Sequence, residues 1–276
     1  MRYNYNDIDL HIHTNDSDGK CTSEQIVKKA YDEGLKLISI TDHNYFTNNY
    51  ETKKLAEEHS IILIPGIEFS VQFEKKFFHL LAYFNEKNVN KLKHLFSMYN
   101  RIKYKKLVEF MKKLKDENIL LTTENVNKFG RLSFKNIARA MVQEGYVNSF
   151  DAAMDKYIDN KQFFNCKVGL PITDVIETIH DMGGVVSLAH PFHSFSDEVT
   201  IKNMINQLVS MGVDGIECYN GKQTSDKTSI LRELASQHNL IETGGSDFHG
   251  STEDGGLGIK QYISIDKDNA FWENFI

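Results

Sequence analysis

The 276-residue sequence contains no apolar segment approaching the roughly 18 to 20 residues that a membrane-spanning helix requires. Its first residues, MRYNYNDIDL, lack the basic and then apolar order of a signal peptide. These absences predict a cytoplasmic protein without a membrane partner. The three cysteines, Cys21, Cys166 and Cys218, are too widely spaced for a zinc ribbon or a redox pair, so we expect reduced structural thiols.

The sequence also lacks an excess of basic residues, with a formal net charge of −6 and a pI of about 6.0. A broad basic surface for binding long nucleic acids is therefore not expected. A small phosphorylated partner stays open, because a few local cations can neutralise it. Serine-hydrolase and P-loop motifs are absent too, so no serine nucleophile or Walker-type phosphate site is indicated.

What the sequence does have is an alternation of short apolar strands and amphipathic helices. The segments IDLHIH and KLISITDH alternate with helical patterns over about 22–33 and 50–59, and the rhythm resumes with VVSLAH, GIECYN and LIETGGSD. Such alternation predicts a mainly parallel sheet or barrel, in which active sites gather at the carboxyl ends of the strands.

The rhythm changes in the middle of the chain, where Lys- and Glu-rich helical patterns occur without a convincing buried strand. We interpret this part as a helical insertion. The expected organisation is a catalytic domain formed by residues 1–90 and 166–276, interrupted by a helical domain over residues 91–165.

Histidines and carboxylates recur at the ends of the predicted strands. His11 and His13 are two residues apart on one strand, so both imidazoles point to the same side. Further polar residues with the same placement are Asp18, His43, Glu68, His79, His190, Asp247 and His249. Each one alone is equally well explained as a satisfied core histidine or a loop acid. As a set they indicate a metal site, and nitrogen and oxygen ligands without thiolates suit Mn, Fe or Zn.

Six segments taken in order, DLHIHTNDSDG, ITDHN, PGIEFS, FHLLAYF, LAHP and GGSDFHG, resemble the motifs of the polymerase and histidinol phosphatase (PHP) family of metal-dependent phosphoesterases. The resemblance covers about residues 7–85 and 167–260. It implies an α/β fold, a distorted (β/α)7 barrel with a small helical insertion domain, and a site for two or three divalent metal ions.

The resemblance also implies which residues bind each metal. It assigns His11, His13, Glu68 and Asp247 to a first ion. It assigns Glu68, as a bridge, with His79 and His190 to a second, and Asp18, His43 and His249 to a third. Asp9 and Asp42 adjoin ligand histidines, and we expect them to orient the imidazoles rather than to bind metal.

The insertion resembles the helical cap of the PHP subgroup that includes nucleotide and oligonucleotide phosphatases, through Gly130-Arg131-Leu132 and IARAMVQEGYV. In that subgroup an Arg at the corresponding position binds the substrate phosphate. Arg131 is therefore the first candidate for this role, and Lys167 is the second. The alternative is a surface Arg at a helix end. His193 stands where relatives often carry Arg or Lys, and it is the candidate to protonate the leaving alkoxide or to contact substrate.

The expected activity is hydrolysis of a phosphomonoester of a nucleotide or another small phosphorylated metabolite by a metal-activated hydroxide, a reaction that needs no Ser or Cys nucleophile. One alternative is a 5′-to-3′ exonuclease acting on short RNA or DNA, and another is a histidinol-phosphate phosphatase. A catalytically inactive regulatory or binding module is the non-enzymatic alternative, and it would predict lost ligands.

Overall fold

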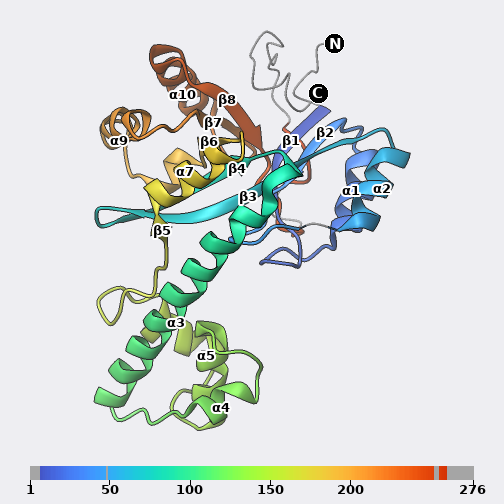
Figure 1. Cartoon of the computed structure of the whole chain (residues 1–276). Helices are drawn as coiled ribbons and strands as arrows, with labels where there is room; N and C mark the ends of the chain where they lie inside the picture. Colours follow the sequence, from blue (N-terminus) through green and yellow to red (C-terminus); the bar gives the residue numbers. More distant parts are fainter. Residues whose placement is uncertain (1–6, 48, 252–254, 260–276) are drawn as a thin grey trace. The chain divides into compact units, whose positions relative to one another are not determined.

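The computed structural model describes residues 7–47, 49–251 and 255–259. The chain forms two compact units (Figure 1). One unit comprises Met1–Phe96 together with Leu170–Ile276, and the other comprises Ser97–Gly169. No helix in the described ranges combines the length and apolar character needed to traverse a lipid bilayer.

The first unit contains a nearly closed barrel of seven strands. In spatial order these are β1 (Ile8–Ile12), β2 (Leu37–Ile40), β3 (Ile62–Phe73), β4 (Lys76–Tyr83), β6 (Val185–Leu188), β7 (Gly215–Asn220) and β8 (Ile241–Gly245). A short β5 (Leu170–Pro171) pairs with β3.

The barrel closes between β1 and the segment that follows β8. The backbone N–H of His13 donates to the carbonyl of Phe248 at 2.9 Å, and the N–H of Asp247 donates to the carbonyl of His11 at 2.9 Å. Ile12 also forms a parallel bridge with Phe248. The predicted distorted (β/α)7 barrel is confirmed, and its closure joins residues from the two ends of the described chain.

The distortion of the barrel comes from β4. This strand is antiparallel to both β3 and β6, whereas the other neighbouring pairs are parallel. A tight turn joins β3 to β4, with Glu74 in the left-handed region at φ 54°, as a two-residue hairpin requires. His79 therefore enters the barrel from an antiparallel strand, opposite Ser70 of β3.

Helices of the first unit lie against this sheet (Figure 1). They are α1 (Ser23–Asp32), α2 (Tyr50–Glu58), α7 (Ile172–Asp181), α8 (Pro191–Ser194), α9 (Glu198–Ser210) and α10 (Ser225–His238), with a 3₁₀ turn at Glu86–Lys91. Helix α1 begins at a capping box in which Thr22 and Gln25 exchange hydrogen bonds. Its Ile26 and Val27 are fully buried in one core with Ile12 of β1. This packing fixes the strand ends that carry the polar cluster.

The second unit is helical and has a core of its own. It contains most of α3 (Leu92–Asp116), then α4 (Thr123–Asn127), α5 (Phe134–Gln143), α6 (Phe150–Ala153) and a π-helical turn at Met154–Ile158. Phe110, Leu114, Ile137 and Met141 are buried together in its core. The unit falls close to the predicted insertion, whose boundaries at residues 91 and 165 remain a prediction.

Candidate metal centre

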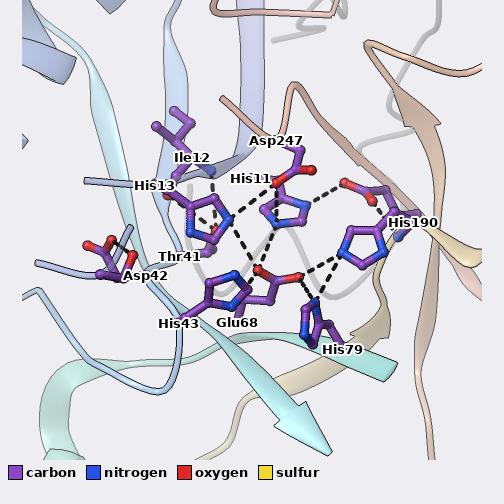
Figure 2. Close-up of polar contacts among 12 residues, drawn as sticks. His11, Ile12, His13, Thr41, Asp42, His43, Glu68, His79, His190 and Asp247 are labelled. Atoms are coloured by element: carbon purple, nitrogen blue, oxygen red, sulfur yellow. Dashed lines mark hydrogen bonds and ion pairs between the residues drawn. The ribbon is translucent and has the colours of Figure 1, made fainter. Parts of the chain in front are cut away.

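The carboxylate of Glu68, on β3, is fully buried and lies at the middle of a group of histidines (Figure 2). Its two oxygens face five imidazoles at 2.9–3.3 Å, those of His11, His13, His43, His79 and His190. Oε1 faces two of these rings and Oε2 the other three. A single carboxylate with two oxygens therefore connects histidines from four separate regions of the chain.

Strand β1 and the residue directly after it supply the deepest pair of imidazoles. His11 and His13 are both fully buried, as expected from their spacing on one strand. Their Nε2 atoms lie 3.5 and 3.3 Å from Oδ1 of Asp247, which follows β8. The barrel closure described above brings this carboxylate to β1, so the Asp247 contact depends on the fold rather than on local sequence.

A third group lies nearer to solvent. Asp18, in the loop after β1, has a side chain that is 41% exposed, and its Oδ1 lies 3.4 Å from Nε2 of His249. Its Oδ2 lies 3.6 Å from Nε2 of His43, and Oδ1 lies 3.7 Å from Nδ1 of His13. The rings of His13 and His249 stack with centroids 4.2 Å apart. His13 thus belongs to both the deep pair and this outer group.

All nine residues predicted as metal ligands are brought together. They form overlapping groups in which the ligand atoms lie within 4.8 Å of one another: His11, His13 and Asp247; His11, Glu68 and His190; His43, Glu68 and His79; and His13, Asp18, His43 and His249. The predicted placement at the ends of the strands explains why distant residues meet, since the parallel strands end at one edge of the barrel.

The ionisation of the cluster reflects opposing effects of burial and charge. Burial raises the pKa of Glu68, but the charges of His79 and His11 outweigh it and hold that pKa well below its usual range. Burial lowers the pKa of His13, yet its contacts with Asp247 and Glu68 raise it to about 9. For His43 burial prevails, and its pKa falls to about 4. The cluster therefore retains ionised carboxylates in a buried environment.

Several polar atoms of the cluster have no hydrogen-bond partner among the described residues. They are Nε2 of His11, both ring nitrogens of His13, Nδ1 of His43 and Oε2 of Glu68, and all of them are buried. Buried polar atoms without partners are costly and rare in folded proteins. Imidazole nitrogens and carboxylate oxygens are ligands of Mn, Fe and Zn, so the cluster fits divalent cations.

Backbone conformation at two of these positions is unusual. His190 has φ 27° and Asp247 has φ 55°, in a region that residues other than glycine seldom occupy. A hydrogen bond from the backbone N–H holds each of them in place. The N–H of Asp247 donates to the carbonyl of His11, and the N–H of His190 donates to Oε2 of Glu217 at 2.6 Å. Strained positions of this kind concentrate at functional sites because the surrounding contacts enforce them.

Glu217 was missed by the sequence reasoning. It lies on β7, is fully buried, and its Oε1 is 2.9 Å from Nδ1 of His11. The available signal was an acidic residue inside the apolar strand segment GIECYN, where an unpaired carboxylate would be costly.

The two acids expected to orient imidazoles have other partners. Asp9 accepts hydrogen bonds from the backbone N–H groups of His11, Ser246 and Gly258 at 2.8–3.2 Å. Asp42 accepts from the N–H and hydroxyl of Thr14 at 2.8 and 2.6 Å, among other hydroxyl donors. Both acids thus fix the loops that carry the histidines, whereas the ring of His11 has Glu217 as its partner and the ring of His249 has the carbonyl of Asp247.

The residues predicted to contact the substrate belong to different units of the chain. His193, on α8, is exposed and lines a pocket of about 280 Å³ together with His190 and Asp247. Arg131 and Lys167 are exposed residues of the helical unit, where Arg131 lines a separate pocket of about 400 Å³. Their predicted role in binding phosphate stays a prediction.

The cysteines give no sign of nucleophilic chemistry. None of the three is in a disulfide, and Cys218 is fully buried. Burial raises the pKa of Cys166 to about 12 and that of Cys218 well above its usual value. Neither thiol is activated as a thiolate near neutral pH.

Comparison with known proteins agrees with this geometry. A 5′-3′ exoribonuclease from Haemophilus influenzae is 29% identical over 270 residues, covering 97% of this chain and 98% of the relative. A 3′,5′-nucleoside bisphosphate phosphatase from Chromobacterium violaceum is 23% identical over 253 residues, covering 90% and 89%. A solved amidohydrolase from C. violaceum with bound sulfate and no metal superposes with a TM-score of 0.72 at 23% identity, covering 94% of this chain and 91% of that one.

Residues 9–172 match the family described as the PHP domain. This match spans more than half of the chain and contains six of the nine clustered residues, from His11 to His79 together with the turn and strands that bring them together. The protein therefore belongs to the PHP domain family and is a metal-dependent phosphoesterase, as its ordered motifs predicted.

Proposed function

We propose that this PHP-family phosphoesterase hydrolyses phosphate esters of nucleotides, with short RNA attacked from its 5′ end as the leading substrate. The observation that carries the proposal is the convergence of five imidazoles on Glu68, with ligand atoms that have no hydrogen-bond partner among the described residues. Such a site binds cations, and cations bind phosphoryl oxygens.

The proposed division of ligands is the one that the family motifs imply, and each of its residues lies in at least one of the overlapping groups of ligand atoms. His11, His13, Glu68 and Asp247 would hold one cation. Glu68, His79 and His190 would hold a second, and Asp18, His43 and His249 would hold a third. Glu68 suits the bridging position because its two oxygens face different sets of imidazoles.

Bound divalent cations would supply Lewis-acid chemistry, which neutralises phosphoryl charge and makes hydroxide available near neutral pH. The chain's own residues set the geometry of this site. Glu217 accepts from Nδ1 of His11, which leaves Nε2 of that ring facing the cluster. Glu217 also holds the strained backbone of His190.

His193 is better suited to contact substrate than to supply a proton. Partial burial of the ring and the nearby His190 lower its pKa, which favours the neutral imidazole. Its backbone N–H donates to the carbonyl of His190 at 2.9 Å, which fixes His193 beside a proposed ligand. We assign it the role of a hydrogen-bond partner for the substrate phosphate or its leaving oxygen.

Support for RNA as substrate comes from the exoribonuclease relative, which is similar along nearly the full length of both chains. The net charge of −6 favours short RNA over long nucleic acids, because long polyanions are bound through broad basic surfaces. Arg131 and Lys167 would contribute the cationic contacts of the helical unit.

A second candidate is a nucleoside 3′,5′-bisphosphate. The bisphosphate phosphatase relative supports it, and so does the small size of the pocket beside His190, about 280 Å³. Both candidates have in common a nucleotide with more than one phosphoryl group.

The test is a product analysis. Purified protein with Mn²⁺ would be incubated with a 5′-labelled oligoribonucleotide, adenosine 3′,5′-bisphosphate, AMP, histidinol phosphate and p-nitrophenyl phosphate. We expect mononucleotides released in order from the 5′ end, together with hydrolysis of the bisphosphate. The His13→Ala protein serves as the inactive control. Absence of hydrolysis on all five substrates would overturn the proposal and favour a binding module.

A further inference from the structure

A pocket of about 280 Å³ extends from the metal centre along the barrel rim. His190 and Asp247 line one part of it, and the loop between β7 and α10 lines another. All of its walls belong to the barrel unit. The volume is near the lower end for ligand sites, which suits one nucleotide end rather than a longer strand.

Two lysines give this pocket a local positive charge. Lys222 and Lys227 line it, and the one carboxylate on its described walls is Asp247, a proposed metal ligand. Nζ of Lys227 lies 5.0 Å from the ring centroid of Phe192, also a lining residue. No described carboxylate lies within ion-pair distance of Lys227. The charge of Lys227 is therefore not balanced by a described carboxylate, in contrast with the acidic chain as a whole.

An amide on the same wall has an unused donor. Asn220 is 7% exposed, and its Nδ2 has no hydrogen-bond partner within the described residues. Its Oδ1 accepts from the backbone N–H of Lys222 at 3.1 Å, which fixes the amide orientation. Gln223 braces the loop by donating to the carbonyl of Cys218 at 2.7 Å. The end of β7 at Asn220 and the loop that carries Lys222 are thus held in place by hydrogen bonds between them.

We infer that this pocket binds a second phosphoryl group of the substrate, one that is not hydrolysed. The metal centre would hold the scissile group, while Lys222, Lys227 and Asn220 supply donors to the other. Ammonium and amide donors match the acceptor oxygens of a phosphate, and charge-assisted bonds of this kind are the strong ones. The inference rests on the proposed function, because it takes the substrate to be a nucleotide with at least two phosphoryl groups.

The subsite accounts for how one active centre could select among phosphorylated nucleotides. A substrate with phosphoryl groups on both sides of one ribose would span the metal centre and the lysine pocket. A nucleotide with a single phosphoryl group would occupy one of the two positions. Preference for the first kind is a consequence of the two-position site and needs no base-specific contact.

The experiment compares adenosine 3′,5′-bisphosphate with adenosine 3′-monophosphate. With Mn²⁺, kcat and KM would be measured for both on wild type, Lys222→Gln and Lys227→Met. Binding of both compounds to chelator-treated protein, where turnover is absent, would be measured by calorimetry. We expect each substitution to weaken binding of the bisphosphate by about 10- to 100-fold and that of the monophosphate by much less.

A matched control is Lys28→Met, which removes one exposed lysine from α1, away from the pocket lining. It should leave both affinities at their wild-type values. Equal affinities for the bisphosphate in wild type and both pocket variants would overturn the subsite while leaving nucleotide hydrolysis intact. Absence of hydrolysis by the wild type, with a lysine-dependent preference retained in calorimetry, would instead overturn the proposed function alone.

Discussion

Nδ1 of His11 lies 2.9 Å from Oε1 of Glu217, and both side chains are fully buried although 206 positions separate them in the chain. A neutral imidazole has one donor and one acceptor nitrogen. With Nδ1–H donating to Glu217, the lone pair of Nε2 is directed at the cluster, where that atom has no hydrogen-bond partner among the described residues. Glu217 thus sets the ring of His11 in the orientation and tautomer that a metal ligand needs.

Replacing Glu217 should therefore weaken metal binding without removing a ligand. For Glu217→Gln we expect Mn²⁺ affinity to fall by about 10- to 100-fold, the usual effect of losing such a supporting carboxylate. Excess Mn²⁺ should restore activity. Metal titration calorimetry measures the change, with the exposed Glu177→Gln on α7 as control. An unchanged affinity in the Glu217 variant would show that His11 is oriented by other contacts.

Removing a central ligand should have a larger effect. Either His13→Ala or Asp247→Ala is expected to abolish both phosphoester hydrolysis and metal retained through purification, because both residues face the deep part of the cluster. Elemental analysis and turnover of p-nitrophenyl phosphate would be measured on the same samples. His94→Ala, at an exposed position of α3, is the histidine control. Full turnover by a ligand variant would contradict the assignment.

Much of this centre follows from periodicity and strand order. His11 and His13 were predicted to share one face because alternate residues on a strand do so, and both are buried in the cluster. The helical pattern predicted over about residues 22–33 is likewise present as α1, which begins at the Thr22 capping box. These features are local, so their cause lies within a few residues.

What the sequence did not reveal depends on distant contacts. The direction of β4 cannot be read from its apolar pattern, since parallel and antiparallel buried strands have similar composition. The partner of Glu217 is a histidine on another strand, so the acid alone did not identify its role. Asp9 and Asp42 were placed correctly beside the histidines, but adjacency in sequence did not tell which groups they bind.

Metal binding should depend on pH in a defined direction. In the absence of metal, burial lowers the pKa of His13, but its contacts with Asp247 and Glu68 prevail and raise it to about 9. The ring is then protonated near pH 7 and must lose a proton to bind metal. Mn²⁺ affinity should therefore increase from neutral pH towards about pH 9. Calorimetry in two buffers of different ionisation enthalpy would detect the released proton, and a flat pH profile would argue against it.

Arg131 offers a test of the helical unit. If its guanidinium binds substrate phosphate, Arg131→Met should raise KM for short RNA by about tenfold or more, because a charge-assisted contact is lost. Metal content should stay unchanged, since the residue belongs to the unit formed by Ser97–Gly169. Arg131→Lys would recover part of the effect, as a lysine retains charge without the planar fork. Lys112→Met, also exposed on α3, provides the control, and equal KM values would exclude the role.

The close approach of β8 to β1 makes Gly245 a sensitive position. A Cβ added there would collide with the backbone and Cβ of His11, whereas one added at Gly221 would meet only ordinary contacts with Ser246. Gly245→Ala should force the two strands apart, at a cost of roughly 1–3 kcal/mol in the free energy of unfolding. It should also weaken metal binding, because Asp247 lies in the segment after β8 and its backbone N–H donates to the carbonyl of His11.

Denaturant unfolding and metal titration of Gly245→Ala and Gly221→Ala would separate the two effects. Wild-type stability and affinity in Gly245→Ala would mean that the strand contact does not position Asp247.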